Sequence, residues 1–129
     1  MSGDTRLTNQ ARDLVDTASG YTACIFADTR DEADRVEVQI KRVSGGVGPS
    51  TLREAAMFFS LGEPVQPFQA FSVVGVGDDA VGETIPGVAF IVFARGDVLV
   101  YVGAGSTSMS AAALRTGVTN LATTIAADL

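Results

Sequence analysis

Hydrophobic residues recur along this chain with two different periods, and the period predicts which segments form helices. From about Thr8 to Ser19, apolar residues stand three or four positions apart, which is typical of one face of a helix. These apolar positions are Ala11, Leu14, Val15 and Ala18. The same spacing predicts helices from about Thr51 to Leu61 and from about Ser108 to Ala127. Thr107 or Ser108 is expected to cap the last helix.

Other segments have the composition or the two-residue alternation of strands. The run from Tyr21 to Ala27 is short and rich in β-branched and aromatic residues. Val36 to Val43 alternates apolar with polar residues, which predicts a half-buried strand that pairs with the first as a hairpin. A third strand is predicted from Phe68 to Val74.

The clearest unit is a hairpin made of Val88 to Ala94 and Val98 to Ala104, joined through Arg95-Gly96-Asp97. A loop of Gly96 and Asp97 suits a type II′ turn and sets the pairing of the strands. The predicted pairs are Ala94 with Leu99, Phe93 with Val100, and Val92 with Tyr101. Both faces are apolar: Ile91, Phe93, Val100 and Val102 lie on one, and Phe90, Val92, Leu99 and Tyr101 on the other. A hairpin without a solvent-facing side is usually covered on both faces.

These elements predict one α+β domain spanning residues 1–129. Their expected order is α-β-β-α-β-β-β-α, with an antiparallel sheet of about five strands flanked by helices.

The charge and the length of the apolar runs exclude several classes of partner. The 15 acidic and 9 basic residues give a net charge of −6. Affinity for nucleic acid rests on neutralising phosphates, so no nucleic-acid partner is expected. The longest apolar run, Val88 to Ala94, is far shorter than the ~20 residues of a membrane-spanning helix. We therefore expect no membrane span.

The glycine-rich stretch from Gly75 to Ala80 fits the Gly-x-Gly-x-x-Gly/Ala pattern of dinucleotide-binding turns. Such a turn must open into a helix whose N-terminus faces the pyrophosphate. The segment from Val81 to Gly87 carries two glycines and a proline, which argues against a helix. Asp78 and Asp79 would also occupy the place of phosphates. We interpret the stretch as a strand end with a tight turn, and we expect no nucleotide binding.

The remaining residue types give no catalytic, cofactor or metal site. The chain has no histidine, which removes the commonest general base and metal ligand. Its single cysteine, Cys24, lies among apolar neighbours and is expected to be buried and inert. Arg95-Gly96-Asp97 is the tripeptide that integrins recognise, but a hairpin tip needs Gly-Asp for its backbone alone. Asp78, Asp79 and Glu83 would make a carboxylate site only if the fold brought them together.

Several segments together resemble the globular domain of a family of secreted actinobacterial lipoproteins of unknown function. They are the strand with Cys24, the alternating strand from Val36 to Val43, "VVGVGDDAV", "VAFIVFARGDVLVYVGAG" and the closing Ala/Leu helix. The resemblance runs from about Leu7 to Leu129, and related envelope lipoproteins resemble the PsbP-type fold. It implies an antiparallel sheet between helices and brings no known reaction. Family members usually begin with an export signal and a lipid-bearing cysteine, and neither is found here.

The leading hypothesis is a non-catalytic domain of the cell-envelope type that binds a partner protein or an apolar ligand and needs no cofactor. Its candidate surface is the second hairpin face, formed by Phe90, Val92, Leu99 and Tyr101. The location would be extracytoplasmic if a signal segment was trimmed, and cytoplasmic otherwise. One alternative is a cytoplasmic, dimeric regulatory module of the roadblock or profilin-like type. The other is a small carboxylate-dependent enzyme.

Overall fold

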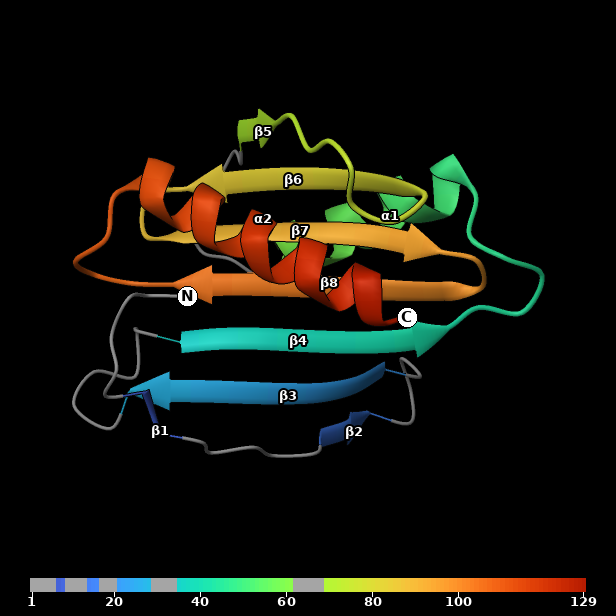
Figure 1. The fold of residues 1–129 in the computed structure, drawn as a ribbon, viewed down its shortest axis with the longest axis horizontal. Coiled ribbons are helices and arrows are strands. Elements are labelled where there is room, and N and C mark those ends of the chain that lie inside the picture. Colours follow the sequence, from blue (N-terminus) through green and yellow to red (C-terminus); the bar gives the residue numbers. More distant parts are fainter. Residues whose placement is uncertain (1–6, 9–13, 17–20, 29–34, 62–68) are drawn as a thin grey trace.

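A computed structural model describes residues 7–8, 14–16, 21–28, 35–61 and 69–129 of the chain. An antiparallel sheet runs through the molecule, and two helices pack on its opposite faces (Figure 1). The strands are β1 (Leu7–Thr8), β2 (Leu14–Asp16), β3 (Tyr21–Asp28), β4 (Arg35–Arg42), β5 (Gln69–Phe71), β6 (Asp79–Ile85), β7 (Val88–Arg95) and β8 (Val98–Gly105). The helices are α1 (Pro49–Leu61) and α2 (Ala111–Asp128). The order across the sheet is β1-β3-β4-β8-β7-β6-β5, and β2 also pairs with β3. The predicted α+β class with an antiparallel sheet is confirmed.

The central hairpin, β7 and β8, has the predicted register. Phe93 pairs with Val100, and Val92 pairs with Tyr101. Gly96 adopts a φ of 61° at the first loop position, and no described residue other than glycine has a positive φ. A type I′ turn would need a positive φ at Asp97 as well, so the turn is of type II′ as predicted.

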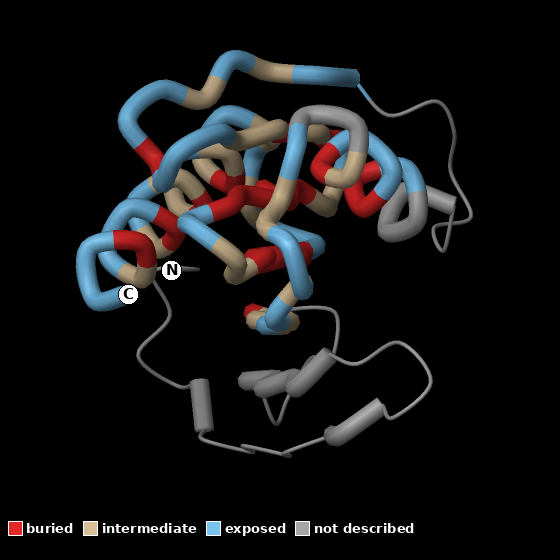
Figure 2. Tube along the Cα trace, turned by 90° about the vertical axis from the view of Figure 1, so that its right-hand side faces the viewer, coloured by how far each residue is buried: buried red, intermediate tan, exposed pale blue. Residues whose placement is uncertain are grey.

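Each face of this hairpin is covered by one helix. On the first face, Ile91 and Phe93 pack against Leu114, Val118 and Ala122 of α2. On the second face, Phe90, Val92, Leu99 and Tyr101 pack against Leu52, Ala55 and Ala56 of α1. Figure 2 shows the buried residues concentrated in the middle of the sheet and on the helix sides that face it. The molecule therefore has three layers, α2 on sheet on α1.

Helix α2 begins later than the sequence predicts. Its N-cap is Ser110, whose Oγ accepts a hydrogen bond from the Ala113 N–H at 3.1 Å. The hydroxyl of Ser106 accepts bonds from the N–H groups of Ser108 and Met109, at 3.1 Å each. These bonds hold a separate turn before the helix, so the helix starts only after the turn ends.

The helix predicted from Thr8 to Ser19 is wrong for the residues that the structure describes. Leu14–Asp16 form β2, which pairs with Tyr21–Ala23 of β3, and Leu7–Thr8 form β1. Residues 9–13 and 17–20 of the predicted helix lie outside the described part. The prediction rested on four apolar positions, two of them alanine, and pairing with a neighbouring strand overrides so weak a signal.

Strand β6 is the element that the sequence pattern missed. The sequence predicts a strand end with a tight turn from Gly75 to Ala80 and no strand after it, whereas β6 spans Asp79–Ile85. The third strand, predicted from Phe68 to Val74, is only the short β5 (Gln69–Phe71). Gly82 sits where a Cβ would come within 2.6 Å of the Phe71 ring. Because Gly82 has no side chain, the Phe71 ring of β5 can pack over β6 at this position. The glycine does not interrupt the strand.

Strand β4 extends the sheet beyond the area on which α2 packs. Helix α2 packs on β7, β8 and β6. On the same sheet face, β4 presents Val36, Val38 and Ile40, and burial decreases from Val36 at 6% exposed to Ile40 at 38%. This decrease shows that the apolar face continues past the helix and becomes accessible.

Candidate functional site

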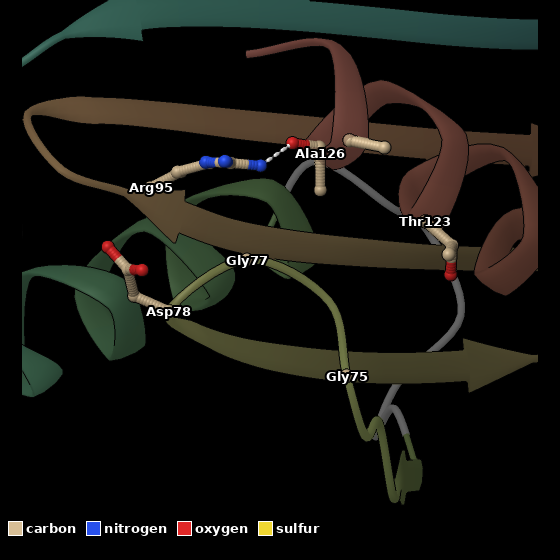
Figure 3. A pocket seen from close by; sticks show the side chains of 7 residues that line it. Gly75, Gly77, Asp78, Arg95, Thr123 and Ala126 are labelled. Atoms are coloured by element: carbon tan, nitrogen blue, oxygen red, sulfur yellow. Dashed lines mark hydrogen bonds between the residues drawn. The ribbon is translucent and has the colours of Figure 1, made fainter.

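A cleft of about 370 Å³ opens where three segments that are far apart in the sequence meet (Figure 3). The turn before β6 contributes Gly75, Gly77 and Asp78, and the end of β7 contributes Arg95. The last turns of α2 contribute Thr123, Ala126 and Ala127. Both sequence motifs singled out above, the glycine turn and the tripeptide, therefore supply residues to one cleft.

The glycine turn is shaped by close packing against β7. Gly77 has a φ of 60°, and a Cβ there would lie 2.5 Å from the Ala94 carbonyl oxygen. The next residue, Asp78, donates its N–H to the same carbonyl at 2.7 Å. Gly75 also has a positive φ, 76°, but a Cβ there would meet nothing within 4 Å. Packing explains the glycine at position 77, whereas at position 75 only the backbone conformation requires it.

The turn leads into strand β6, not into a helix. The prediction that no helix follows Gly75 to Ala80 is thus confirmed, and the geometry of a dinucleotide fingerprint is missing from this part of the chain. That the turn binds no nucleotide stays a prediction.

All three residues of Arg95-Gly96-Asp97 contact other parts of the chain. Arg95 donates from Nη1 to the carbonyl oxygen of Ala126 in α2. The Gly96 N–H donates to Asp78 Oδ2 at 2.7 Å, and Arg42 Nη1 donates to Asp97 Oδ2 at 3.2 Å. The hairpin tip is therefore hydrogen-bonded to α2, to the glycine turn and to the end of β4. These bonds support the interpretation that the tripeptide is present for the structure of the turn, not for integrin recognition.

The charges around the cleft have an asymmetric arrangement. Figure 3 shows the Arg95 side chain reaching across toward Ala126, while the Asp78 side chain extends away from α2. Arg95 thus places its positive charge at the C-terminal end of α2, where a helix carries a partial negative charge. Because the Asp78 carboxylate is bonded to the Gly96 N–H, it faces the hairpin tip.

The three acidic residues considered for a carboxylate site do not converge. Asp78 binds Gly96, and Asp79 Oδ1 accepts the N–H of Ala80 at 2.9 Å. Glu83 lies four residues further along β6 than Asp79, which is roughly 13 Å along a strand. No group of three potential metal ligands occurs within the described residues.

Glu83 is nevertheless unusual, because one of its carboxylate oxygens is buried, which no sequence pattern indicates. In register it pairs with Phe90 of β7 and Ala70 of β5. Its Oε2 atom is buried and has no hydrogen-bond partner in the described part of the chain. Burial removes the carboxylate from water and raises its pKa from the ordinary value of 4.5.

The candidate surface of Phe90, Val92, Leu99 and Tyr101 lies in the core beneath α1. Their exposed fractions are 1%, 0%, 3% and 7%, and the rings of Phe90 and Tyr101 have centroids 5.4 Å apart. Helix α1 therefore occupies the face that the sequence left open. A role of these four residues in binding a partner or ligand stays a prediction.

Cys24 pairs with Val38 through the backbone of β3. The structure describes β3 by its backbone only, so the predicted burial of the thiol stays a prediction. Neither described helix has the length and apolar content to cross a membrane.

No protein-family model, no curated protein sequence and no solved structure matches this chain. The resemblance to secreted lipoproteins therefore has no independent support, and function must be argued from the chain's own surfaces.

Proposed function

We propose that this chain is a non-catalytic domain that binds a protein partner through the apolar face of β4 beside α2. The observation that carries the proposal is the exposure of Ile40, 38%, at the end of an apolar row that begins in the core. Among the described residues, the large apolar side chains that are more exposed are Met57, Val74 and Leu129. They lie on α1, in the loop before the glycine turn and after α2, outside this row.

The row is continuous with the core on the α2 side of the sheet. Val38 packs against the cluster that contains Val100 and Val102. Leu121 and Ile125 of α2 are partly buried and pack against the same cluster. Together these side chains form an apolar strip that runs from the last turns of α2 onto β4. Helix α2 covers this sheet face at β7 and β8, and a bound partner would cover it at β4.

A charged residue stands at the open end of the strip. Side chains alternate along a strand, so Arg42 shares the sheet face of Val36, Val38 and Ile40, and 77% of its side chain is accessible beside its partner Asp97. An apolar centre with a polar rim is the usual anatomy of a protein interface. The strip therefore favours a protein partner that brings an apolar centre to Ile40 and polar groups to the Arg42–Asp97 pair.

Ile40→Lys tests the proposal, with Val74→Lys as the matched control. Val74 is 87% exposed and lies away from the strip, so its variant removes an equally apolar side chain from another place. We expect the wild type to bind a fluorescent apolar probe at this strip. Ile40→Lys should lose this behaviour and Val74→Lys should keep it. Equal behaviour of the two variants would contradict the proposal.

The cellular setting is part of the same proposal. The resemblance to secreted actinobacterial lipoproteins favours an extracytoplasmic location in the cell envelope. A gene start that encodes an export signal and a lipid-attachment cysteine upstream of this segment would support it, and a start without them would favour the cytoplasm.

The second candidate is a dimeric regulatory module of the roadblock or profilin-like type. It is favoured by the arrangement of β3, β4, α1, β6, β7, β8 and α2, in which one helix covers each face of an antiparallel sheet. This candidate requires a stable dimer in light scattering, including at micromolar concentration. A monomer under those conditions would remove it and leave the first proposal standing.

A further inference from the structure

We infer that the cleft between the glycine turn, Arg95 and the end of α2 binds a small oxyanion, the carboxylate or phosphate group of a ligand. This inference goes beyond the partner-binding surface proposed above, because the cleft and the β4 strip use different residues. It rests on the hydrogen-bond donors that border the cleft and on the direction of the one carboxylate there.

Arg95 supplies the first set of donors. A guanidinium group carries five N–H donors in a planar fork that matches carboxylate and phosphate oxygens. In the structure Arg95 is exposed, and within the described residues its hydrogen bond goes to the Ala126 carbonyl oxygen. The rest of its donor capacity is open to a ligand, and Figure 3 shows the side chain spanning the cleft from β7 to α2.

The glycine turn supplies the second set. The positive φ angles of Gly75 and Gly77 enclose Val76, and alternating conformations of this kind turn successive N–H groups toward one concave side. Within the described residues, only the N–H of Asp78, the next residue, has a protein acceptor in this turn. Gly75 and Gly77 line the cleft, and their N–H groups are therefore available to oxygen atoms of a ligand, whereas Val76 between them is buried in the core.

The acidic residues do not block the cleft. The sequence alone predicts that Asp78 and Asp79 occupy the place of an anion. In the structure the Asp78 carboxylate is held by the Gly96 N–H on the far side of the turn, and Asp79 is bonded to the N–H of Ala80. Two features weaken anion binding here: the C-terminal end of α2 carries a partial negative charge, and the anion must share Arg95 with the Ala126 carbonyl oxygen. We therefore expect weak, saturable binding.

The size and openness of the cleft limit the ligand to a small molecule or to the terminal group of a larger one. A volume of about 370 Å³ lies at the lower end of small-molecule sites, which span roughly 300–1,000 Å³. A dinucleotide would also need the helix N-terminus that this turn lacks.

Amide NMR titration of the whole chain tests the inference. Sodium phosphate and sodium acetate are added separately, with sodium chloride at the same ionic strength as the reference. We expect saturable shifts of the Gly75 and Gly77 amides beyond those caused by chloride. Acetate alone causing them would assign a carboxylate, phosphate alone a phosphate, and both the shared oxyanion chemistry. No saturable shift with either salt overturns the inference.

Variants separate binding from folding. Arg95→Gln should weaken the apparent affinity at least tenfold, and Arg95→Lys, which keeps the charge but loses the fork, should fall between it and the wild type. Arg53→Gln on the exposed side of α1 is the matched control and should leave the titration unchanged. If the amide spectrum of Arg95→Gln shows that this variant is unfolded, the affinity of Arg95→Lys tests the inference instead. Unchanged affinity in a folded Arg95 variant overturns the inference. Ile40→Lys should still bind the anion, so failure of the partner-binding proposal is distinguishable.

Discussion

The two faces of the β7–β8 hairpin are each covered by one helix, yet they are built from different chemistry. The α2 face is an apolar cluster in which Ile91, Phe93, Val100 and Val102 are all fully buried. The α1 face carries Phe90 and Tyr101 together with the Glu83 carboxylate, which pairs in register with Phe90. A hairpin that is apolar on both sides in the sequence therefore acquires one face with Arg95 bonded to α2 at its edge, and one face with a carboxylate, Glu83, at its edge.

The largest expected effect is the loss of a buried ring on the α2 face. Phe93→Ala should lower the free energy of unfolding by about 3–5 kcal/mol, because Phe93 is 0% exposed and its removal leaves a cavity. Phe90→Ala on the α1 face should fall at the lower end of that range, since the opened space lets water reach the Glu83 carboxylate. Urea unfolding of both variants measures the difference. A greater loss from Phe90→Ala would contradict this ranking of the two faces.

Gly77→Ala should be the next most harmful change. A left-handed backbone costs a residue with a side chain about 1–3 kcal/mol, and the new Cβ would also press on the Ala94 carbonyl. Gly75→Ala is the matched control, with a similar φ but no atom within 4 Å. Thermal unfolding should therefore rank Gly77→Ala below Gly75→Ala in stability. The reverse order would mean that the turn does not pack on β7 as described.

Glu83 makes the stability of the α1 face depend on pH. Its folded-state pKa is raised by burial, so the stabilisation from the protonated form is complete below pH 4.5 and is lost as the pH rises through the raised folded-state value. Glu83→Gln should remove this loss. Glu83→Met should raise stability at pH 7 by about 1 kcal/mol, because it removes a buried oxygen without a partner.

Urea unfolding of the wild type and of both variants between pH 4 and pH 8 checks this expectation. Asp79→Asn, on the same strand but exposed, is the control and should leave the profile nearly unchanged. A wild-type profile that matches that of Glu83→Gln would show that Glu83 has the same pKa in the folded and unfolded states.

The smallest effect is expected at the hairpin tip, which belongs to neither face. Asp97→Ala removes an exposed ion pair in which the Asp97 side chain is 47% and the Arg42 side chain 77% accessible. The substitution should lower the free energy of unfolding by less than about 1 kcal/mol. The cost should fall further in high salt, because exposed ion pairs are screened. A loss as large as that of Phe93→Ala would place the tip inside the cooperative core.

The hairpin was predictable in detail because its information is local. A two-residue loop with glycine first fixes the pairing of Phe93 with Val100, and the structure has this register. Strand β6 was not predictable in the same way, because Gly82 is explained only by the Phe71 ring packed over it. The helix predicted from Thr8 to Ser19 failed at Leu14–Asp16, where pairing with β3 decides the conformation.

The candidate cleft shows the same division. The sequence identified the glycine turn and the tripeptide Arg95-Gly96-Asp97 as separate motifs, but nothing in it joined them to Ala126, which lies 31 residues after Arg95. The contact between Arg95 and α2, and that between Gly96 and Asp78, exist because the chain folds back on itself.

The sequence by itself determined the α+β class, the central hairpin with its register, and two of the helices, because hydrophobic periodicity and turn chemistry act between near neighbours. Only the tertiary structure decided which helix covers which face, that Phe90 and Tyr101 are core residues, and that the apolar face of β4 extends beyond α2. It also decided that one carboxylate oxygen of Glu83, Oε2, is buried without a hydrogen-bond partner among the described residues. These properties depend on packing between distant segments, which the periodicity of a single segment does not contain.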